Sequence, residues 1–168
     1  NKDSAISKSI YTINFNGESI TEISSSNGTA SAIFDPISKM LAIIESSPED
    51  PPSFSLLNCK ENVSLDLQSI ILNDDRVENF NLNPPNIITL DSESNDQLYS
   101  AIYKPDARKF SPPYPTVLYV YGGPHSQLVT NSYSLTSAMR IQRLRQNGFL
   151  VCILDNRGTF RRGIKFEG

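Results

Sequence analysis

The sequence predicts two successive parts, an all-β segment followed by the first strands of an α/β domain. Up to about residue 75, short strand-like runs alternate with turn residues; after it, an apolar strand, a helix and a second apolar strand follow one another. A length of 168 residues is enough for one to two domains. We therefore expect residues 1–75 and residues 76–168 to form separate domains.

The all-β part begins with a predicted hairpin. Residues 10–15 alternate polar and apolar side chains, with the period of two that is typical of a half-buried strand. Asn16 and Gly17 follow directly, and this dipeptide favours a tight turn in which both residues take positive φ. Residues 18–24 form the predicted return strand.

Further short strands are expected in the rest of this part. Residues 31–34 and 40–46 pair across a turn at 35–39, and residues 53–59 resume the strand pattern after a proline-rich break. Short strands in this order predict a β-sandwich or one blade of a β-propeller.

The second part also opens with a strand pair, formed by residues 86–91 and 97–105 across a polar turn. Residues 116–121 are almost wholly apolar, which is typical of a strand buried on both faces of a mostly parallel sheet.

A crossover is expected after this strand. Residues 134–147 place Leu135, Ala138, Ile141 and Leu144 on one helical stripe, and Gly148 is typical of the residue that ends a helix. Residues 149–155 form a second buried strand, so strand, helix and strand predict a βαβ unit.

Composition excludes several classes of function. A net charge of -3 is too balanced for a nucleic-acid-binding protein or one that binds anionic membranes. No apolar run approaches the length of about 20 residues that crosses a bilayer. Cys59 and Cys152 show neither metal-ligand spacing nor a disulfide framework. We expect no metal and no cofactor, and a reducing, cytoplasmic compartment. Because the chain stops abruptly at Gly168, we also expect a fragment of a longer protein.

Two loops are candidates for a functional site. Ligands of open α/β sheets bind beyond the carboxyl ends of the strands. Tyr121-Gly122-Gly123-Pro124 lies at one such end and Asp155-Asn156-Arg157-Gly158 at another. Glycine lets the backbone approach a substrate closely, and the Tyr121 hydroxyl is a donor that can face a developing negative charge.

The residues around these loops resemble a known family. The stretches YPTVLYVYGGPHSQLV and GFLVCILDNRGTFRRGIKFEG are similar to the prolyl oligopeptidase family of serine peptidases. The tetrapeptides Asn-Arg-Gly-Thr and Lys-Phe-Glu-Gly resemble the dipeptidyl peptidase IV branch of this family, including the dipeptidyl peptidase 8 and 9 type. The resemblance implies the last blade of a β-propeller joined to the N-terminal part of an α/β-hydrolase domain.

The resemblance also implies a reaction and partners. In this family a serine on a Gly-x-Ser-x-Gly elbow attacks the peptide carbonyl, assisted by histidine and aspartate. Tyr121 is the expected side-chain donor to the oxyanion, and the loop from Asp155 to Gly158 is expected to be structural. The expected substrates are peptides with a free N-terminus, which lose a dipeptide, and the expected assembly is a homodimer.

The sequence departs from the family pattern because no Gly-x-Ser-x-Gly occurs in it. The only histidine, His125, follows the Gly-Gly-Pro turn without an orienting partner nearby in sequence, so it is not expected to act as a base. We therefore expect the chain to be inactive by itself. Alternatives remain an acylaminoacyl-peptidase, an endopeptidase, a non-catalytic binding protein of the same fold, and an independent β-domain formed by the first half.

Overall fold

The computed structural model describes residues 4–24, 27–60, 68–70, 79–121 and 123–167. These residues form two compact units. Unit 1 comprises Asn1–Phe80 with Asn131–Tyr133, and unit 2 comprises Asn81–Thr130 with Ser134–Gly168. The domain boundary predicted between residues 75 and 76 lies outside the described residues and stays a prediction. In the part of the chain that is described, no helix combines the length and apolarity needed to cross a membrane.

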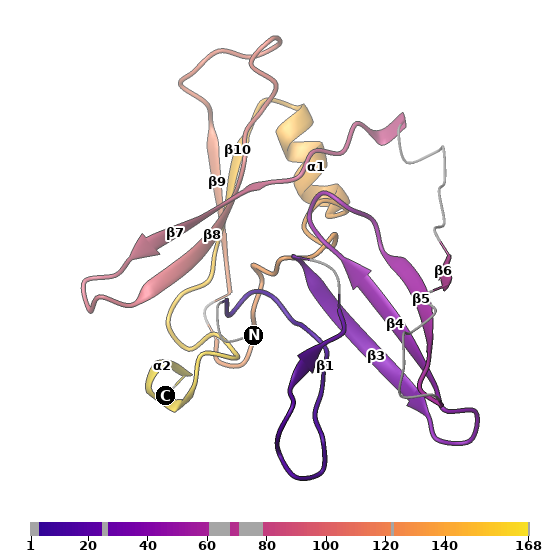
Figure 1. Cartoon of the computed structure of the whole chain (residues 1–168). Helices are drawn as coiled ribbons and strands as arrows, with labels where there is room; N and C mark the ends of the chain where they lie inside the picture. The colour runs from indigo at the N-terminus through magenta and orange to yellow at the C-terminus, as the bar shows by residue number, and fades with distance from the viewer. Residues whose placement is uncertain (1–3, 25–26, 61–67, 71–78, 122, 168) are drawn as a thin grey trace. The chain divides into compact units, whose positions relative to one another are not determined.

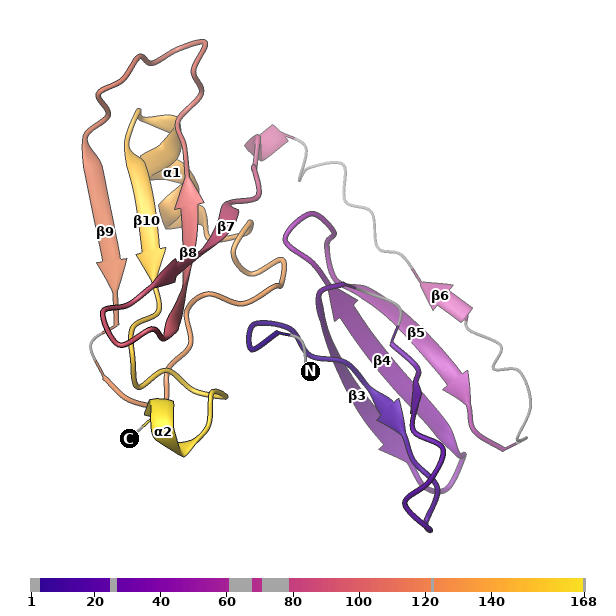
Figure 2. The ribbon, with the colours of Figure 1, turned by 60° about the vertical axis from the view of Figure 1, so that its left-hand side comes forward.

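Unit 1 contains an antiparallel sheet of four strands in the order β3-β4-β5-β6 (Figures 1 and 2). Its strands and those of a separate hairpin are β1 (Tyr11–Thr12), β2 (Thr21–Glu22), β3 (Thr29–Asp35), β4 (Met40–Ser46), β5 (Ser53–Asn58) and β6 (Gln68–Ile70). Each strand of the sheet pairs with the next in sequence, which is the meander of a propeller blade. The predicted turn between β3 and β4 is present, and the Asp35 carboxylate accepts hydrogen bonds from the backbone N–H groups of Ile37 and Ser38.

The hairpin at residues 10–24 differs from its prediction. The paired strands β1 and β2 are two residues long each, with further backbone hydrogen bonds from Asn14 to Glu18 and from Ile23 to Ile10. Gly17 takes a φ of +82°, but Asn16 holds the turn through its side chain, whose oxygen accepts the N–H of Glu18. Ile13 is 58% exposed and Phe15 is fully exposed, so the alternating pattern does not mark a buried face here.

Unit 2 contains a mixed sheet in the order β7-β8-β10-β9. Its elements are β7 (Asn86–Asp91), β8 (Gln97–Tyr103), β9 (Thr116–Val120), α1 (Met139–Gln146), β10 (Leu150–Leu154) and α2 (Ile164–Glu167). β7 pairs antiparallel with β8, which confirms the predicted hairpin. β9 and β10 are parallel and joined through α1, which confirms the βαβ crossover.

The core of unit 2 lies on β8 and β10. Ala101, Tyr103, Val151 and Ile153 are buried there. The prediction that residues 116–121 are buried on both faces is wrong, since Leu118 is 60% exposed. The physical reason is position: β9 is an edge strand of the described sheet, with a neighbour on one side only.

The helix of the crossover begins at Met139 and not at residue 134. Two carbonyls of the segment before the helix accept hydrogen bonds from side chains, one from β8 and one from α1 itself. The Tyr103 hydroxyl donates to the carbonyl of Leu135 at 2.8 Å, and the Gln142 amide donates to that of Thr136 at 2.9 Å. Residues 133–137 therefore form turns before the helix starts.

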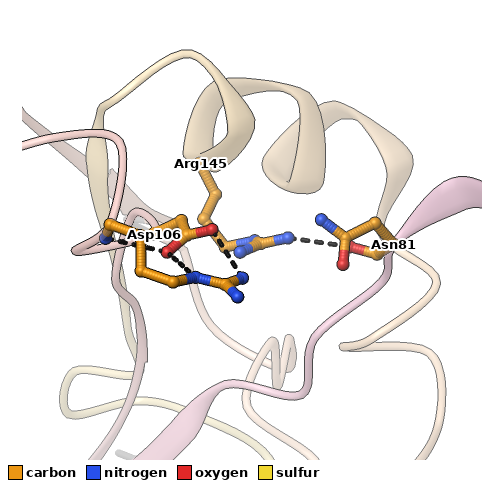
Figure 3. A network of polar contacts seen from close by, with 4 residues as sticks. Asn81, Asp106 and Arg145 are labelled. Atoms are coloured by element: carbon orange, nitrogen blue, oxygen red, sulfur yellow. Dashed lines mark hydrogen bonds and ion pairs between the residues drawn. The ribbon is translucent and has the colours of Figure 1, made fainter.

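Buried polar side chains of α1 also hold the segment that leads into β7. Arg145 is 3% exposed and donates to the carbonyl of Asn81 at 2.8 Å, as Figure 3 shows with Asp106 nearby. Gln142 donates to the carbonyl of Asn83 at 2.7 Å and accepts a hydrogen bond from Arg145 at 2.9 Å. These contacts fix the start of the α/β unit against its own helix.

Candidate functional site

The two candidate loops leave the same edge of the unit 2 sheet. In the parallel pairing of β9 with β10, Val120 lies opposite Leu154, the last residue of each strand. Tyr121 and Asp155 follow directly, so the sheet brings the start of one loop beside the start of the other. This is the carboxyl edge at which open α/β sheets bind ligands.

Tyr121 is 48% exposed, and its side chain lies close to the backbone of Gly123. A Cβ atom added at Gly123 would lie 2.9 Å from Cε1 of Tyr121 and 3.1 Å from its hydroxyl oxygen. The missing side chain of Gly123 therefore makes room for the tyrosine ring. Gly122, the other candidate glycine, lies outside the described residues.

The turn after Gly123 contacts the second loop. The backbone N–H of His125 donates to the carbonyl of Gly158 at 3.2 Å. A Cβ atom at Gly158 would lie 3.9 Å from Cα of Pro124, and the φ of Gly158 is +91°, a conformation that favours glycine. The exposed His125 is held here by its backbone, with a φ of +62°.

Asp155, the first residue of the second loop, binds the first loop through its side chain. Its side chain is almost wholly enclosed, the residue being 4% exposed, and its two oxygens accept the backbone N–H groups of Leu128 at 2.8 Å and Val129 at 2.9 Å. Burial raises the pKa of Asp155 above its ordinary value, while these two hydrogen bonds and the charge of Arg162 act in the opposite direction. The structural hydrogen bonding expected of this residue is present.

The remaining candidates of the second loop contact the surrounding structure. The Arg157 guanidinium lies 3.3 Å from the Asp96 carboxylate and donates to the carbonyl of Lys165 at 3.1 Å. Asn156 is exposed, and its carbonyl accepts the N–H of Thr159. Since the Arg157 side chain is 50% exposed, its ion pair contributes little to stability and serves mainly to orient the loop.

Arg162 has a larger structural role than the sequence indicates. Its guanidinium carbon lies 4.1 Å from the ring centre of Phe166 and 5.3 Å from that of Tyr99, and it donates to the carbonyl of Gln97. The Glu167 carboxylate accepts the N–H groups of Arg162 and Gly163, and these bonds lower its pKa. The stacking partner Tyr99 is far away in sequence, so only the folded sheet shows it.

The arrangement presents at its surface a phenol that can donate a hydrogen bond. The Tyr121 hydroxyl stands on a half-exposed side chain at the carboxyl edge of the sheet, where the neighbouring loop is fixed by Asp155 and Gly158. Such a donor stabilises negative charge that develops on a bound substrate.

Comparison with known proteins identifies what the chain resembles. It is 42% identical to dipeptidyl peptidase 8 of Mus musculus, and equally to that of Homo sapiens, over 85 residues that make up 51% of this chain. A crystal structure of Porphyromonas gingivalis dipeptidyl peptidase 4 superposes on 99% of the chain with a TM-score of 0.81 and 27% identity. No protein-family model matches the chain.

These similarities confirm both the resemblance to dipeptidyl peptidases and the predicted fold class, the end of a β-propeller followed by the start of an α/β-hydrolase domain. The aligned part makes up 10% of the length of each curated relative, and the chain covers 23% of the Porphyromonas gingivalis chain.

Proposed function

We propose, on the premise that the chain is similar to dipeptidyl peptidases, that it is part of a serine-type peptidase that removes dipeptides from the N-terminus of peptides. Within it, Tyr121 donates its hydroxyl to the oxyanion that forms when the serine attacks the peptide carbonyl. The observation that supports this role is the position of Tyr121, half exposed at the carboxyl edge of the sheet and packed on Gly123.

The nucleophile belongs to another part of the protein in this proposal. The 168 residues contain no Gly-x-Ser-x-Gly and one histidine, His125, whose backbone is engaged by Gly158. The chain alone therefore contributes one oxyanion donor and no serine, aspartate and histidine triad, and it is inactive without the rest of the protein. The homodimer and the cytoplasmic location stay predictions.

The oxyanion role is tested in the full-length protein with Tyr121→Phe, which removes only the hydroxyl. Loss of one oxyanion donor is expected to lower kcat about 100- to 1,000-fold, with little change in KM, because the interaction forms mainly in the transition state. Tyr119→Phe is the matched control, since Tyr119 lies in β9 and is 46% exposed. An unchanged kcat for Tyr121→Phe would exclude the role.

The type of peptidase is tested with paired chromogenic amides that differ only at the N-terminus. A dipeptidyl amide with a free amine and proline or alanine at its second position is the expected substrate. Preference for the N-acylated amide would indicate an acylaminoacyl-peptidase or endopeptidase instead. Cleavage of neither amide by the folded protein would favour a non-catalytic binding protein.

A further inference from the structure

Asp155 is a buried carboxylate to which the proposed reaction gives no role. It is 4% exposed, and a carboxylate this deep is costly unless its oxygens are hydrogen bonded. Its own N–H donates to the carbonyl of Tyr99 at 3.0 Å, which keeps the residue in line with the sheet beyond the last paired residue of β10. Its side chain is therefore attached directly to the strand pair that carries the core of unit 2.

Both carboxylate oxygens bind the far end of the tyrosine loop, of which Tyr121 and residues 123–129 are described. One accepts the N–H of Leu128 at 2.8 Å and the other that of Val129 at 2.9 Å. Here each N–H binds a different oxygen of one side chain, an arrangement that an ionised carboxylate allows and an amide, with a single oxygen, does not. Val129 is fully buried, so this end of the loop is fixed in the core.

Two further anchors fix the other parts of the loop. Its start continues from β9, where Val120 pairs with Leu154, and its middle is held by the hydrogen bond from His125 to Gly158. All three anchors connect the loop to β10 or to the residues directly after it. The tyrosine ring lies against Gly123, which stands between the first and the second of these anchors.

We propose that Asp155 is a positioning residue for the reaction, which fixes residues 123–129, against which the Tyr121 ring lies, so that the Tyr121 hydroxyl is held ready for the oxyanion. The inference rests on the proposed oxyanion role of Tyr121. Asp155 acts through the backbone N–H groups of Leu128 and Val129 and does not contact the substrate. Its effect therefore belongs to the transition state and not to substrate binding.

The test is a double-mutant cycle in the full-length protein, with Asp155→Asn, Tyr121→Phe and both changes together. Asparagine keeps the size of the side chain but places an NH₂ group against one of the two N–H donors. Displacement of a catalytic group by about 1 Å costs on the order of 100-fold in rate, so we expect Asp155→Asn to lower kcat roughly 10- to 100-fold with KM within about 2-fold. In the Tyr121→Phe background the same change should cost less than about 3-fold, because the donor to be positioned is gone.

Asp106→Asn is the matched control. Asp106 also accepts a backbone N–H, that of Arg108, but lies on a different loop of unit 2. It should leave kcat and KM unchanged. If Asp155→Asn does not fold, Asp155→Glu replaces it in the same cycle, since glutamate retains two acceptor oxygens while its longer chain shifts the loop.

The outcomes separate this inference from the proposed function. No effect of Tyr121→Phe would overturn both. A large effect of Tyr121→Phe together with an unchanged kcat for the Asp155 variant, or with effects that multiply independently, would overturn the positioning role alone. A fall in kcat that is lost in the Tyr121→Phe background supports it.

Discussion

The Tyr103 hydroxyl lies in the core of unit 2, where the residue is 1% exposed and donates to the carbonyl of Leu135 at 2.8 Å. Tyr103→Phe would leave that carbonyl without this donor, and we expect a loss of about 1 kcal/mol in the free energy of unfolding. Burial also raises the pKa of Tyr103 above its ordinary value of 10.0. Because the pKa is raised in the folded state, the stability that the neutral side chain contributes is fully present below pH 10.0. It is lost progressively as the pH rises above 10.0 towards the folded-state pKa.

Denaturant titrations at several pH values from 8 to 11 would measure both effects. The unfolding free energy of the unsubstituted chain should fall by up to about 1.4 kcal/mol per pH unit above the ordinary pKa of Tyr103. Tyr103→Phe should remove this contribution to the pH dependence. Tyr11→Phe, at a residue 45% exposed, is the control. The same pH slope in all three proteins would contradict the burial argument.

Gly123 matters because of the tyrosine ring and not because of its own backbone. Its φ lies outside the left-handed region, so alanine would add only a Cβ, 2.9 Å from Cε1 of Tyr121. The ring is free to turn away, and we expect Gly123→Ala to lower kcat of the full-length protein about 10-fold or more while the melting temperature changes little. Turnover and thermal unfolding are measured on the same samples. An unchanged kcat would show that the ring position is not critical.

At the scale of one element, α1 shows what the sequence predicts and what it does not. The apolar stripe through Ile141 and Leu144 identifies the helix, and its end before Gly148 is correct to within one residue. Its start was predicted at Ser134 and lies at Met139. The turns before it are stabilised by Tyr103, which lies 32 residues from Leu135, and no local pattern carries such a contact.

Gln142 is the central polar side chain of α1. It is 1% exposed, donates to the carbonyls of Asn83 and Thr136, and accepts a hydrogen bond from Arg145. Gln142→Ala would leave the buried Arg145 guanidinium, the buried carbonyl of Thr136 and the carbonyl of Asn83 without this partner, and we expect a loss of about 2–4 kcal/mol in the free energy of unfolding. Gln146→Ala, on the exposed face of the same helix, should change it by less than about 0.5 kcal/mol. If chemical denaturation showed the same loss of unfolding free energy for both variants, the structural role given to Gln142 would be wrong.

For the strands too, the sequence predicts some features and not others. Alternation and turn residues correctly predict β3, β4 and β5, because each pairs with its neighbour in sequence. Alternation alone does not decide burial, as the exposed Phe15 shows, since burial depends on whether another layer covers that face. An apolar run such as β9 likewise predicts a strand but not its place at the edge of the described sheet.

For the whole molecule, the strand order explains why the candidate site could be predicted in part. Strand ends of a βαβ unit meet at one edge, so the pattern alone predicts that Tyr121 and Asp155 lie near one another. The bonds from Leu128 and Val129 to Asp155 could not be predicted, because they depend on the path of a loop without a repeating pattern.

Chemical inertness of the chain is a prediction at this scale. A serine-directed fluorophosphonate requires an activated serine, and the chain has no Gly-x-Ser-x-Gly and a single histidine. We expect no labelling of the purified 168-residue chain under conditions that label the full-length protein completely. Stoichiometric labelling of the short chain, located by mass spectrometry, would reveal a nucleophile that sequence and structure do not indicate.

The central position of β10 has a consequence for the order in which unit 2 folds. β8 and β9 do not pair with one another; each pairs with β10, which comes last of the four strands in sequence. During synthesis at about 5–20 residues per second, β9 therefore emerges seconds before its partner exists. Until then the backbone N–H and C=O groups of β9 that later pair with β10 have no partner strand, and such an unpaired edge is open to other nascent chains. The helix between β9 and β10 thus determines how long the unfinished sheet is at risk of aggregation.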